Sequence, residues 1–429
     1  MKDHRRFLAL AASLAVLVGC TAPPDGQIRQ SRTNAFTAYW PVQGANGKLR
    51  VAVKDLIDIQ GTVTTAGSEY IAKNARPAAQ DAKCLQIIRE RNIPIVGKTN
   101  LTEMAVTVSG ENTYFGTPKN RFSGRGEVIP GGSSSGSAVA VKYGMADVAI
   151  GTDTAGSIRV PAACCGVWGL KTTFGLVPIE GVFPISPKNL DTVGPLARNV
   201  KHLVQGMDLL ERGFAAKYAQ AVREKPTAGQ IKIGRLYLTG TDPLIDKAID
   251  DELMAKGFKL VNLSPAFRKQ WDQGQRDGKV IAAADAWISD RPYSKVKGVN
   301  FLTKAVFALG EVEYKLRYKD ALKRREQWRR ALRETFEKVD LIAVPTLQGL
   351  PPKFPFWGSN VIFELRVFNM QNTTGVNYAG NPALAVPIPL SLPVKGKTKT
   401  APVTSLQLVG PRYSEAELLN AGRLLERKP

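Results

Sequence analysis

The chain has 429 residues, with 59 Lys and Arg against 37 Asp and Glu, which gives a net charge of +22 when histidine is neutral. It contains only two histidines, His4 and His202. A metal site built from several histidines is therefore excluded, and a Ser-His-Asp triad would have to use one of these two residues. With 44% hydrophobic and 22% charged residues, the composition is that of a globular protein and not of a disordered one.

Residues 1–20 have the pattern of an export signal. Basic residues at the start are followed by an apolar run over residues 7–18, which is too short to cross a bilayer as a helix. The run ends in Leu-Val-Gly-Cys at residues 17–20, which resembles the lipobox of bacterial lipoproteins, where the cysteine is lipidated and the preceding peptide bond is cut. The resemblance implies a signal peptide over residues 1–19, lipidation at Cys20 and a tether to the membrane over residues 20–34. An ordinary signal peptide without lipidation is the alternative interpretation.

The same resemblance implies a location in the bacterial cell envelope, facing the periplasm. Thr21 follows the cysteine, and a residue other than aspartate here favours the outer membrane over the inner one. Cleavage would remove His4 and two units of net positive charge, leaving +20. Because the chain has no nucleic-acid-binding motif, we expect no nucleic-acid partner, and the charge serves either solubility or contact with an anionic envelope surface. The oligomeric state is not predicted.

Apolar runs and helical patterns alternate along the rest of the chain. They predict strands at 49–53, 93–96, 148–150, 231–236 and 341–344, and helices that include 79–91 and 137–143. This alternation predicts an α/β protein whose sheet is covered by helices on both faces. Three cysteines follow Cys20, and they lack metal-ligand spacing and are odd in number, so buried free thiols are expected at Cys84, Cys164 and Cys165.

Residues 313–338 are predicted to form one long helix. Lys and Arg outnumber Asp and Glu in this segment, while Leu322, Leu332 and Phe336 fall near one stripe. We therefore expect a packed surface helix with a basic outer face. Contact of that face with a membrane or an anionic polymer is the more specific alternative.

Gly, Ser and Thr concentrate between Gly131 and Gly175, where backbone N–H groups can approach a ligand closely. A phosphate-binding loop is excluded because the string Gly-x-x-x-x-Gly-Lys-Ser/Thr is absent. A nucleophile elbow fits residues 132–136 with Ser134 at its centre, but it needs a histidine. Only His202 follows, in a stretch that is better explained as a structural surface helix. A serine hydrolase with a lysine base is the third interpretation.

The third interpretation has specific support, because the block resembles the amidase signature family. Residues 131–134, Gly-Gly-Ser-Ser, and 151–162, Gly-Thr-Asp-Thr-Ala-Gly-Ser-Ile-Arg-Val-Pro-Ala, are similar to the two halves of the signature. Ser133 and Ser157 are 24 positions apart, as in the family. Further similar motifs lie at 51–58, 97–103, 166–173, 194–198, 380–387 and 406–412. The resemblance covers about residues 35–425 and implies one large domain over 35–429 with a mixed, mostly parallel central sheet.

The resemblance also implies a catalytic triad of Ser, cis-Ser and Lys. Ser157 would be the nucleophile, Ser133 the bridging serine on a cis peptide bond, and Lys54 the base that draws the proton of Ser157 through Ser133. A lysine acts as a base only when neutral, so burial must lower its pKa. The apolar residues before Lys54 support burial, whereas Asp55 and Asp58 would oppose it if their carboxylates faced the amine.

The rest of the site is assigned by the same resemblance. The oxyanion hole would use backbone N–H groups of Thr154, Ala155, Gly156 and Ser157, and Asp153 and Arg159 would brace the loop. The acyl pocket would be lined by Ala105, Val106, Thr107, Val108 and Ser109. Segments 284–312 and 351–369 match the family poorly, and such segments shape the leaving-group side.

These residues together predict an envelope-anchored amidase that hydrolyses a carboxylic amide C–N bond through an acyl-Ser157 intermediate. No cofactor and no metal are expected. The substrate would be a small-molecule or peptide amide, and the membrane would be a partner through the lipid anchor. One alternative is a catalytically silent lipoprotein that uses the fold for binding. Another is part of a glutamine-dependent amidotransferase that modifies charged tRNA, which the export signal disfavours.

Overall fold

The computed structural model describes residues 33–41, 47–122, 125–390 and 403–427. The predicted signal peptide, Cys20 and nearly all of the predicted tether lie outside these ranges. Within the described ranges, no helix is both long enough and apolar enough to cross a membrane.

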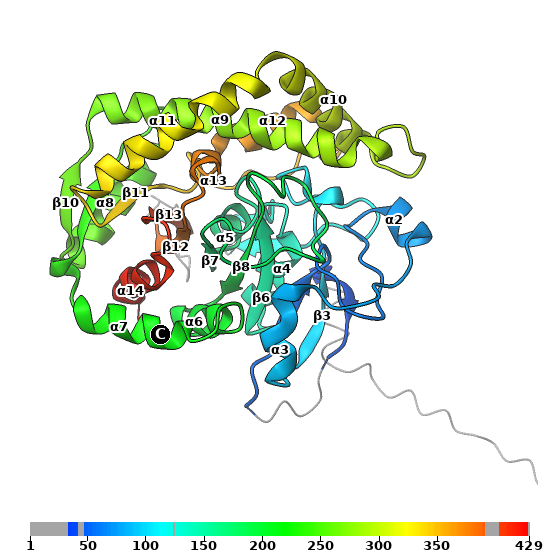
Figure 1. The fold of residues 1–429 in the computed structure, drawn as a ribbon, viewed down its shortest axis with the longest axis horizontal. Coiled ribbons are helices and arrows are strands. Elements are labelled where there is room, and N and C mark those ends of the chain that lie inside the picture. The colour runs from blue at the N-terminus through cyan, green and yellow to red at the C-terminus, as the bar shows by residue number, and fades with distance from the viewer. Residues whose placement is uncertain (1–32, 42–46, 123–124, 391–402, 428–429) are drawn as a thin grey trace, which may run out of the picture.

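One sheet of 11 strands runs through the molecule (Figure 1). Its spatial order is β1 (Phe36–Tyr39), β3 (Ile95–Thr99), β2 (Val51–Lys54), β6 (Val148–Asp153), β8 (Thr192–Ala197), β7 (Trp168–Lys171), β12 (Ala383–Pro389), β13 (Val403–Val409), β11 (Leu341–Pro345), β9 (Lys232–Arg235) and β10 (Lys259–Asn262). A separate hairpin joins β4 (Asn120–Phe122) to β5 (Gly126–Val128). All five predicted strands are present, as β2, β3, β6, β9 and β11, with shifted ends.

The predicted α/β class and mixed sheet are confirmed, but the sheet is not mostly parallel. Within the 11-stranded sheet of the described residues, four pairings are parallel, namely β2–β3, β2–β6, β9–β10 and β9–β11, and the other six are antiparallel. The predicted strands take part in all of the parallel pairings. Strands β1, β7, β8, β10, β12 and β13 of this sheet were not predicted. β7, β8 and β12 contain Gly or Pro, and each antiparallel pairing of the sheet involves β1, β7, β8, β12 or β13.

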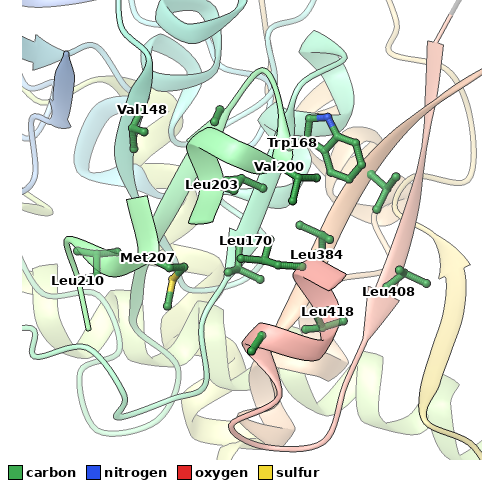
Figure 2. Close-up of a cluster of buried hydrophobic side chains, with 14 of the residues drawn as sticks. Val148, Trp168, Leu170, Val200, Leu203, Met207, Leu210, Leu384, Leu408 and Leu418 are labelled. Carbon is green, nitrogen blue, oxygen red and sulfur yellow. The ribbon is translucent and has the colours of Figure 1, made fainter. Parts of the chain in front are cut away.

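Helices cover both faces of the sheet, as predicted. One face packs against α3 (Gln86–Glu90), α6 (Val200–Asp208), α7 (Phe214–Glu224), α8 (Pro243–Ala255) and α14 (Glu415–Leu425). The other packs against α4 (Ser135–Lys142), α5 (Arg159–Cys165), α9 (Pro265–Asp290), α11 (Tyr318–Phe336) and α13 (Thr374–Ala379). Figure 2 shows part of the first core, where Leu170 and Leu384 of neighbouring strands meet Leu203 of α6 and Leu418 of α14.

Alternation along β2 determines which face carries the site. Val51 and Val53 point into the core beneath α3 and α6, whereas Ala52 lies in the core beneath α4 and α5. Side chains two positions apart share a face, so Lys54 points to the side of α4 and α5. The segments before these helices hold Ser133 and Ser157.

Two helix predictions need correction. Residues 313–338 are not one helix: α10 (Phe301–Leu316) ends where Arg317 leaves helical geometry at φ −132° and ψ −18°, and α11 starts at Tyr318. Both helices pack on α9, as the upper part of Figure 1 shows, so the break lets the chain fold back along it. The buried face of α11 includes Trp328 and Leu332, but Leu322 is 37% exposed.

The predicted helix at 79–91 is shorter in the structure. A 3₁₀ turn at Lys83–Leu85 leads into α3, while the helix predicted at 137–143 is present as α4. The remaining helices are α2 (Glu69–Asn74), α12 (Val361–Met370) and 3₁₀ turns at Glu103–Ala105, Ala228–Gln230 and Arg291–Tyr293.

Candidate active site

Lys54 ends strand β2 and is fully buried on the α4 side of the sheet. Its Nζ donates a hydrogen bond of 2.7 Å to Ser133 Oγ and another of 2.8 Å to Thr152 Oγ1. Thr152 lies in the neighbouring strand β6, which is parallel to β2, so both strands deliver their side chains to the same edge. The amine is thus held against one of the two predicted catalytic serines.

Burial lowers the pKa of Lys54 from 10.5 to about 7, because the charged amine has lost its hydration, while the carboxylates of Asp153 and Asp191 act in the opposite direction. The sequence left open whether the carboxylates of Asp55 and Asp58 face the Lys54 amine and raise its pKa. In the structure they do not face it. Asp55 forms an ion pair of 2.8 Å with buried Lys98, and Asp58 accepts from Thr64. Lys54 is therefore a lysine that can be neutral near neutral pH.

Ser133 follows Gly132 through a cis peptide bond, as predicted. Backbone hydrogen bonds fix this turn: Gly132 N–H donates to the carbonyl of Val108 at 2.7 Å, and Thr102 N–H donates to the carbonyl of Ser133 at 3.3 Å. Helix α4 begins two residues later. The turn presents the Ser133 hydroxyl to Lys54.

Ser157 lies in the loop between β6 and α5, and its side chain forms part of a cleft wall. The N–H of Ser134 donates to the carbonyl of Ser157 at 3.1 Å, which joins the two serine segments directly. The preceding Gly156 has φ +132°, and a Cβ there would lie 2.3 Å from Thr373 Oγ1. Only glycine fits this position, so the glycine and the packing of α13 together shape the loop.

Asp153 and Arg159 brace this loop from beneath, as predicted. Both are fully buried, and the guanidinium makes two bonds to the carboxylate, of 2.9 and 3.0 Å. Arg159 also donates to Gln407 of β13 and to Asn377 of α13. Burial alone would raise the pKa of Asp153, but the charges of Arg159 and Lys171 outweigh it and hold that pKa far below its usual range.

The predicted oxyanion donors are not equivalent. The N–H of Gly156 donates to Asp153 Oδ1 at 2.8 Å, so it is not free to bind an oxyanion, and this part of the prediction is wrong. In the described part of the chain, no acceptor takes a hydrogen bond from the backbone N–H of Thr154, Ala155 or Ser157. The carbonyl of Ala155 is held by Thr373 Oγ1 at 2.6 Å, which limits rotation of the adjoining peptides.

A cleft of about 630 Å³ opens in front of Ser157. Four residues of the predicted acyl pocket line it, namely Ala105, Val106, Thr107 and Val108. The fifth, Ser109, is not on its wall: it is fully buried, and its N–H donates to Glu364 at 3.1 Å. Glu364, which also lines the cleft, accepts from the successive N–H groups of Val108 and Ser109 and holds the backbone at the point where the chain leaves the wall.

Helices α9, α10 and α12 form the rest of the wall. Most of their contributions are apolar: Val280, Ala282, Ala283, Ala286, Leu302, Ala305, Val306, Leu309, Val361, Leu365 and Phe368. Charged residues gather where α9 meets α11 and the end of α10: Arg276, Asp277, Lys279, Glu313, Arg317 and Arg324. Segments 284–312 and 351–369, which match the family poorly in sequence, therefore both contribute residues to the cleft wall.

Comparison with known proteins identifies the family of the chain. The family model described as Amidase matches residues 47–419. The chain belongs to the amidase family. Over 439 residues it is 31% identical to the glutamyl-tRNA(Gln) amidotransferase subunit from Halobacterium salinarum, covering 92% of this chain and 99% of the relative.

Two further members of the amidase family show its breadth. The 2-amino-5-chloromuconic acid deaminase of Comamonas testosteroni is 33% identical over 381 residues, covering 86% of this chain and 79% of that protein. The crystal structure of the glutamyl-tRNA(Gln) amidotransferase subunit from Thermotoga maritima superposes with a TM-score of 0.73 at 26% identity, covering 92% and 88% of the two chains. The amidase signature fold is therefore shown by sequence and by structure.

Sequence reasoning missed Thr152 and Asp191 as partners of this amidase site. Thr152 could have been found from the parallel pairing of β6 with β2, which places it beside Lys54. Asp191 precedes β8 and accepts a hydrogen bond of 2.6 Å from Thr154 Oγ1, a contact that depends on antiparallel pairing with β6. The strand β8 was not predicted, so no local signal pointed to Asp191.

The remaining histidine and the cysteines lie elsewhere. His202 is on α6, and the charges nearest to it include Asp147, which precedes β6 at the end opposite to Asp153. Its separation from Ser157 confirms the structural interpretation. Cys84, Cys164 and Cys165 are free and buried, as predicted. Burial raises the pKa of the Cys84 and Cys165 thiols to about 12, so they stay protonated and unreactive.

Proposed function

We propose that this protein hydrolyses a carboxylic amide through an acyl-enzyme formed on Ser157. The observation that carries the proposal is the buried Lys54, with a pKa of about 7, hydrogen-bonded at 2.7 Å to Ser133 beside the Ser157 loop. A buried lysine amine that forms no salt bridge among the described residues costs free energy to maintain, and such perturbed groups cluster at functional sites.

The proposed mechanism has two halves. Ser157 Oγ attacks the amide carbonyl carbon while its proton passes to Ser133 Oγ, and the proton of Ser133 passes to neutral Lys54. Free N–H groups at Thr154, Ala155 and Ser157 are the candidate donors to the oxyanion, and each donor used contributes about 3–4 kcal/mol. Collapse expels the amine, which receives the proton back along the same route. Water then attacks the acyl-Ser157 ester, with Lys54 again as base.

The cleft supports an amide that carries a sizeable apolar group. Its walls near Ser157 are short residues such as Ala105 and Val106, and α9 adds Ala282, Ala283 and Ala286. A small-molecule amide and a peptide amide both fit a cleft of this kind. We also propose that the enzyme works at the bacterial cell envelope as a lipoprotein anchored through Cys20 and facing the periplasm, with the outer membrane favoured.

Activity can be tested with protein lacking residues 1–20 and a panel of amides, by ammonia or amine release. Ser157→Ala should abolish turnover, and a fluorophosphonate should label the wild type but not this variant. Ser135→Ala is a matched control, because the buried Ser135 hydroxyl has no hydrogen-bond partner among the described residues and lies next to the Ser133–Ser134 turn. Equal turnover by wild type and Ser157→Ala across a broad panel would contradict the proposal.

Anchoring needs a separate test in a bacterial host. Radiolabelled palmitate should be incorporated into the full chain and should be lost in Cys20→Ala. The wild type should fractionate with the outer membrane. Absence of label in the wild type would reject the lipoprotein assignment while leaving the proposed chemistry untouched.

The second candidate is a component of an amidotransferase, favoured by 31% identity over 99% of the Halobacterium salinarum relative. The export signal in residues 1–20 opposes it, since charged tRNA is cytoplasmic. Recovery of the native protein in the cytoplasm, with glutaminase activity only in a complex, would support this candidate over the first. A silent binding lipoprotein, the third possibility, predicts neither labelling nor turnover.

A further inference from the structure

Four cations line the cleft, and they fall into two classes. Arg324 makes two bonds to Asp277, of 2.9 and 2.7 Å, and Arg317 pairs with Glu313 at 2.8 Å. Across the part of the chain that the structure describes, no salt bridge involves Arg276 or Lys279. Lys279 therefore faces the cleft without a carboxylate partner in the described part of the chain, whereas Arg276, one helical turn away on α9, interacts with the charge of Asp272.

Lys279 is the more enclosed of these two cations. It is partly buried, whereas Arg276 is exposed and donates to Gln273. Lys279 Nζ donates to Asn369 at 2.8 Å and lies 5.3 Å from the ring centre of Phe368. Burial alone accounts for the lowered pKa of Lys279, with no nearby carboxylate acting against it. A partly desolvated cation on a ligand-accessible wall is stabilised when an anion reaches it.

Lys279 is connected to the nucleophile loop through the packing of α9 on α13. Its neighbour Gly278 lies so close to α13 that a Cβ would be 2.5 Å from the carbonyl of Thr374. The next residue on that side, Thr373, holds the carbonyl of Ala155. Lys279 thus belongs to the same wall as Ser157, separated from it by the packing of α9 on α13.

An apolar stripe separates Lys279 from the far side of the cleft. Ala282, Ala283 and Ala286 continue along α9, and seven residues of helix from Lys279 to Ala286 span about 10 Å. A ligand lying along this stripe would have an apolar body and could carry its charge at one end.

We infer that Lys279 is the anion-binding residue of a substrate subsite, so that the preferred substrates are amides whose apolar segment ends in a carboxylate. This inference rests on the proposed amide hydrolysis at Ser157. Arg276 adds positive potential at the rim of the same subsite. Phe368 forms the apolar side against which the substrate packs.

A matched substrate series tests the inference with the full chain purified in detergent. Straight-chain amides of four to ten carbons would carry a terminal carboxylate, methyl or ammonium group, and ammonia release would give kcat and KM. At one or more lengths, the carboxylate amide should have a kcat/KM about tenfold or more above that of the methyl amide. No preference for carboxylate at any length, or a preference for ammonium, would overturn the inference.

Variants distinguish recognition from structure. Lys279→Met keeps the apolar stem that packs on Phe368, and it should raise KM for the carboxylate amide about tenfold relative to KM for the methyl amide, with most of the loss in KM and not in kcat. Lys279→Glu should reverse the preference toward ammonium. Lys269→Met is the control, since Lys269 is exposed on the same helix and does not line the cleft. Equal losses on both substrates in Lys279→Met would show a structural role instead.

Binding provides a readout that does not depend on turnover. In a Ser157→Ala background, calorimetry should show the carboxylate amide binding, and Lys279→Met should weaken that binding about tenfold. If binding behaves this way but the wild type hydrolyses no amide, the proposed hydrolysis fails and the subsite stands. If methyl amides are hydrolysed but the carboxylate gives no advantage in binding or KM, the subsite fails and the hydrolysis stands.

Discussion

The chemistry proposed for Lys54 depends on where its neighbours point. Asp55 and Asp58 follow it closely in sequence, yet Lys98 and Thr64 bind their carboxylates. The stabilising charges come from Asp153 and Asp191, which are distant in sequence, and they only partly offset burial. A lysine in this balance can accept and return a proton near neutral pH, which an exposed lysine does rarely.

The pH dependence of activity follows from the same balance. Only the neutral form of Lys54 accepts a proton, so kcat/KM should rise with pH through about 7 and reach a plateau above it. Rates below pH 6 should fall about tenfold per pH unit. The measurement is kcat/KM for a neutral amide between pH 5 and 9. A profile that stays flat across pH 6–8 would contradict Lys54 as the base.

Glycine at position 156 is required by two separate constraints. Gly156→Ala would place a methyl group 2.3 Å from Thr373 Oγ1 at φ +132°. We expect a loss of about 3 kcal/mol or more in the free energy of unfolding, measured by denaturant titration, and a loss of activity. Gly61→Ala separates the causes, because Gly61 has φ +78° and no atom of the described ranges lies within 4 Å of its added Cβ. A smaller loss, of about 1 kcal/mol, is expected there, and equal losses would show that the contact with Thr373 is unimportant.

At the scale of elements, the nucleophile loop is held by a charged centre that joins four of them. Asp153 ends β6, Arg159 begins α5, and their partners Asn377 and Gln407 belong to α13 and β13. Asp153 also accepts from the N–H groups of Gly156 and Ile158, so the carboxylate fixes the backbone on both sides of Ser157. The centre therefore connects these four elements directly behind the nucleophile.

Removing the Arg159–Asp153 ion pair should destabilise the whole fold and not only the nucleophile loop. Arg159→Met leaves Asp153 buried without its partner, and such changes cost about 3–5 kcal/mol. The free energy of unfolding should fall by that amount, with loss of Ser157 labelling by a fluorophosphonate. Lys247→Met is the control, because the Lys247–Asp251 pair on α8 is exposed and exposed pairs contribute under about 1 kcal/mol. A loss in Arg159→Met no larger than that of the control would contradict the bracing role.

Over the whole molecule, stability and chemistry are divided between the two faces of the sheet. The large core, part of which is shown in Figure 2, lies under α6, α7, α8 and α14, whereas Lys54, Ser133 and Ser157 lie on the side of α4 and α5. The ion pairs are divided in a similar way. The buried pairs Lys98–Asp55 and Arg159–Asp153 lie near the site, whereas most of the other ion pairs, such as Lys247–Asp251, are exposed. The cleft itself is built by helices outside these layers, α10 and α12, together with α9.

A core change should therefore affect stability without altering the reaction. Leu384→Ala removes a fully buried side chain of β12 from the α6 side and should cost about 2–5 kcal/mol in the free energy of unfolding. Its kcat/KM at 25 °C should stay within about twofold of the wild type, because the cavity lies across the sheet from Lys54. Met254→Ala, at a side chain that is 58% exposed on α8, is the control and should change neither quantity. A selective fall in activity for Leu384→Ala would show that the two faces are coupled.

The sequence by itself determined the family, the α/β class and the three proposed catalytic residues. It could do so because the serine segments are contiguous motifs with their own glycine turns, and because strands such as β2 and β6 are short apolar runs readable without their neighbours. The anchor at Cys20 stays a prediction from the sequence alone.

The tertiary structure decided what depends on contacts between distant segments. Antiparallel strands such as β8 were not readable locally, so the sheet is less parallel than expected, and Asp191 was missed with them. The hydrogen bond from the Gly156 N–H to Asp153, the hydrogen bond from the Ser109 N–H to Glu364 and the place of Lys279 on the cleft wall also require the packed molecule. Local patterns encode turns and strand faces, whereas hydrogen-bond partners and cleft walls are determined by which elements pack together.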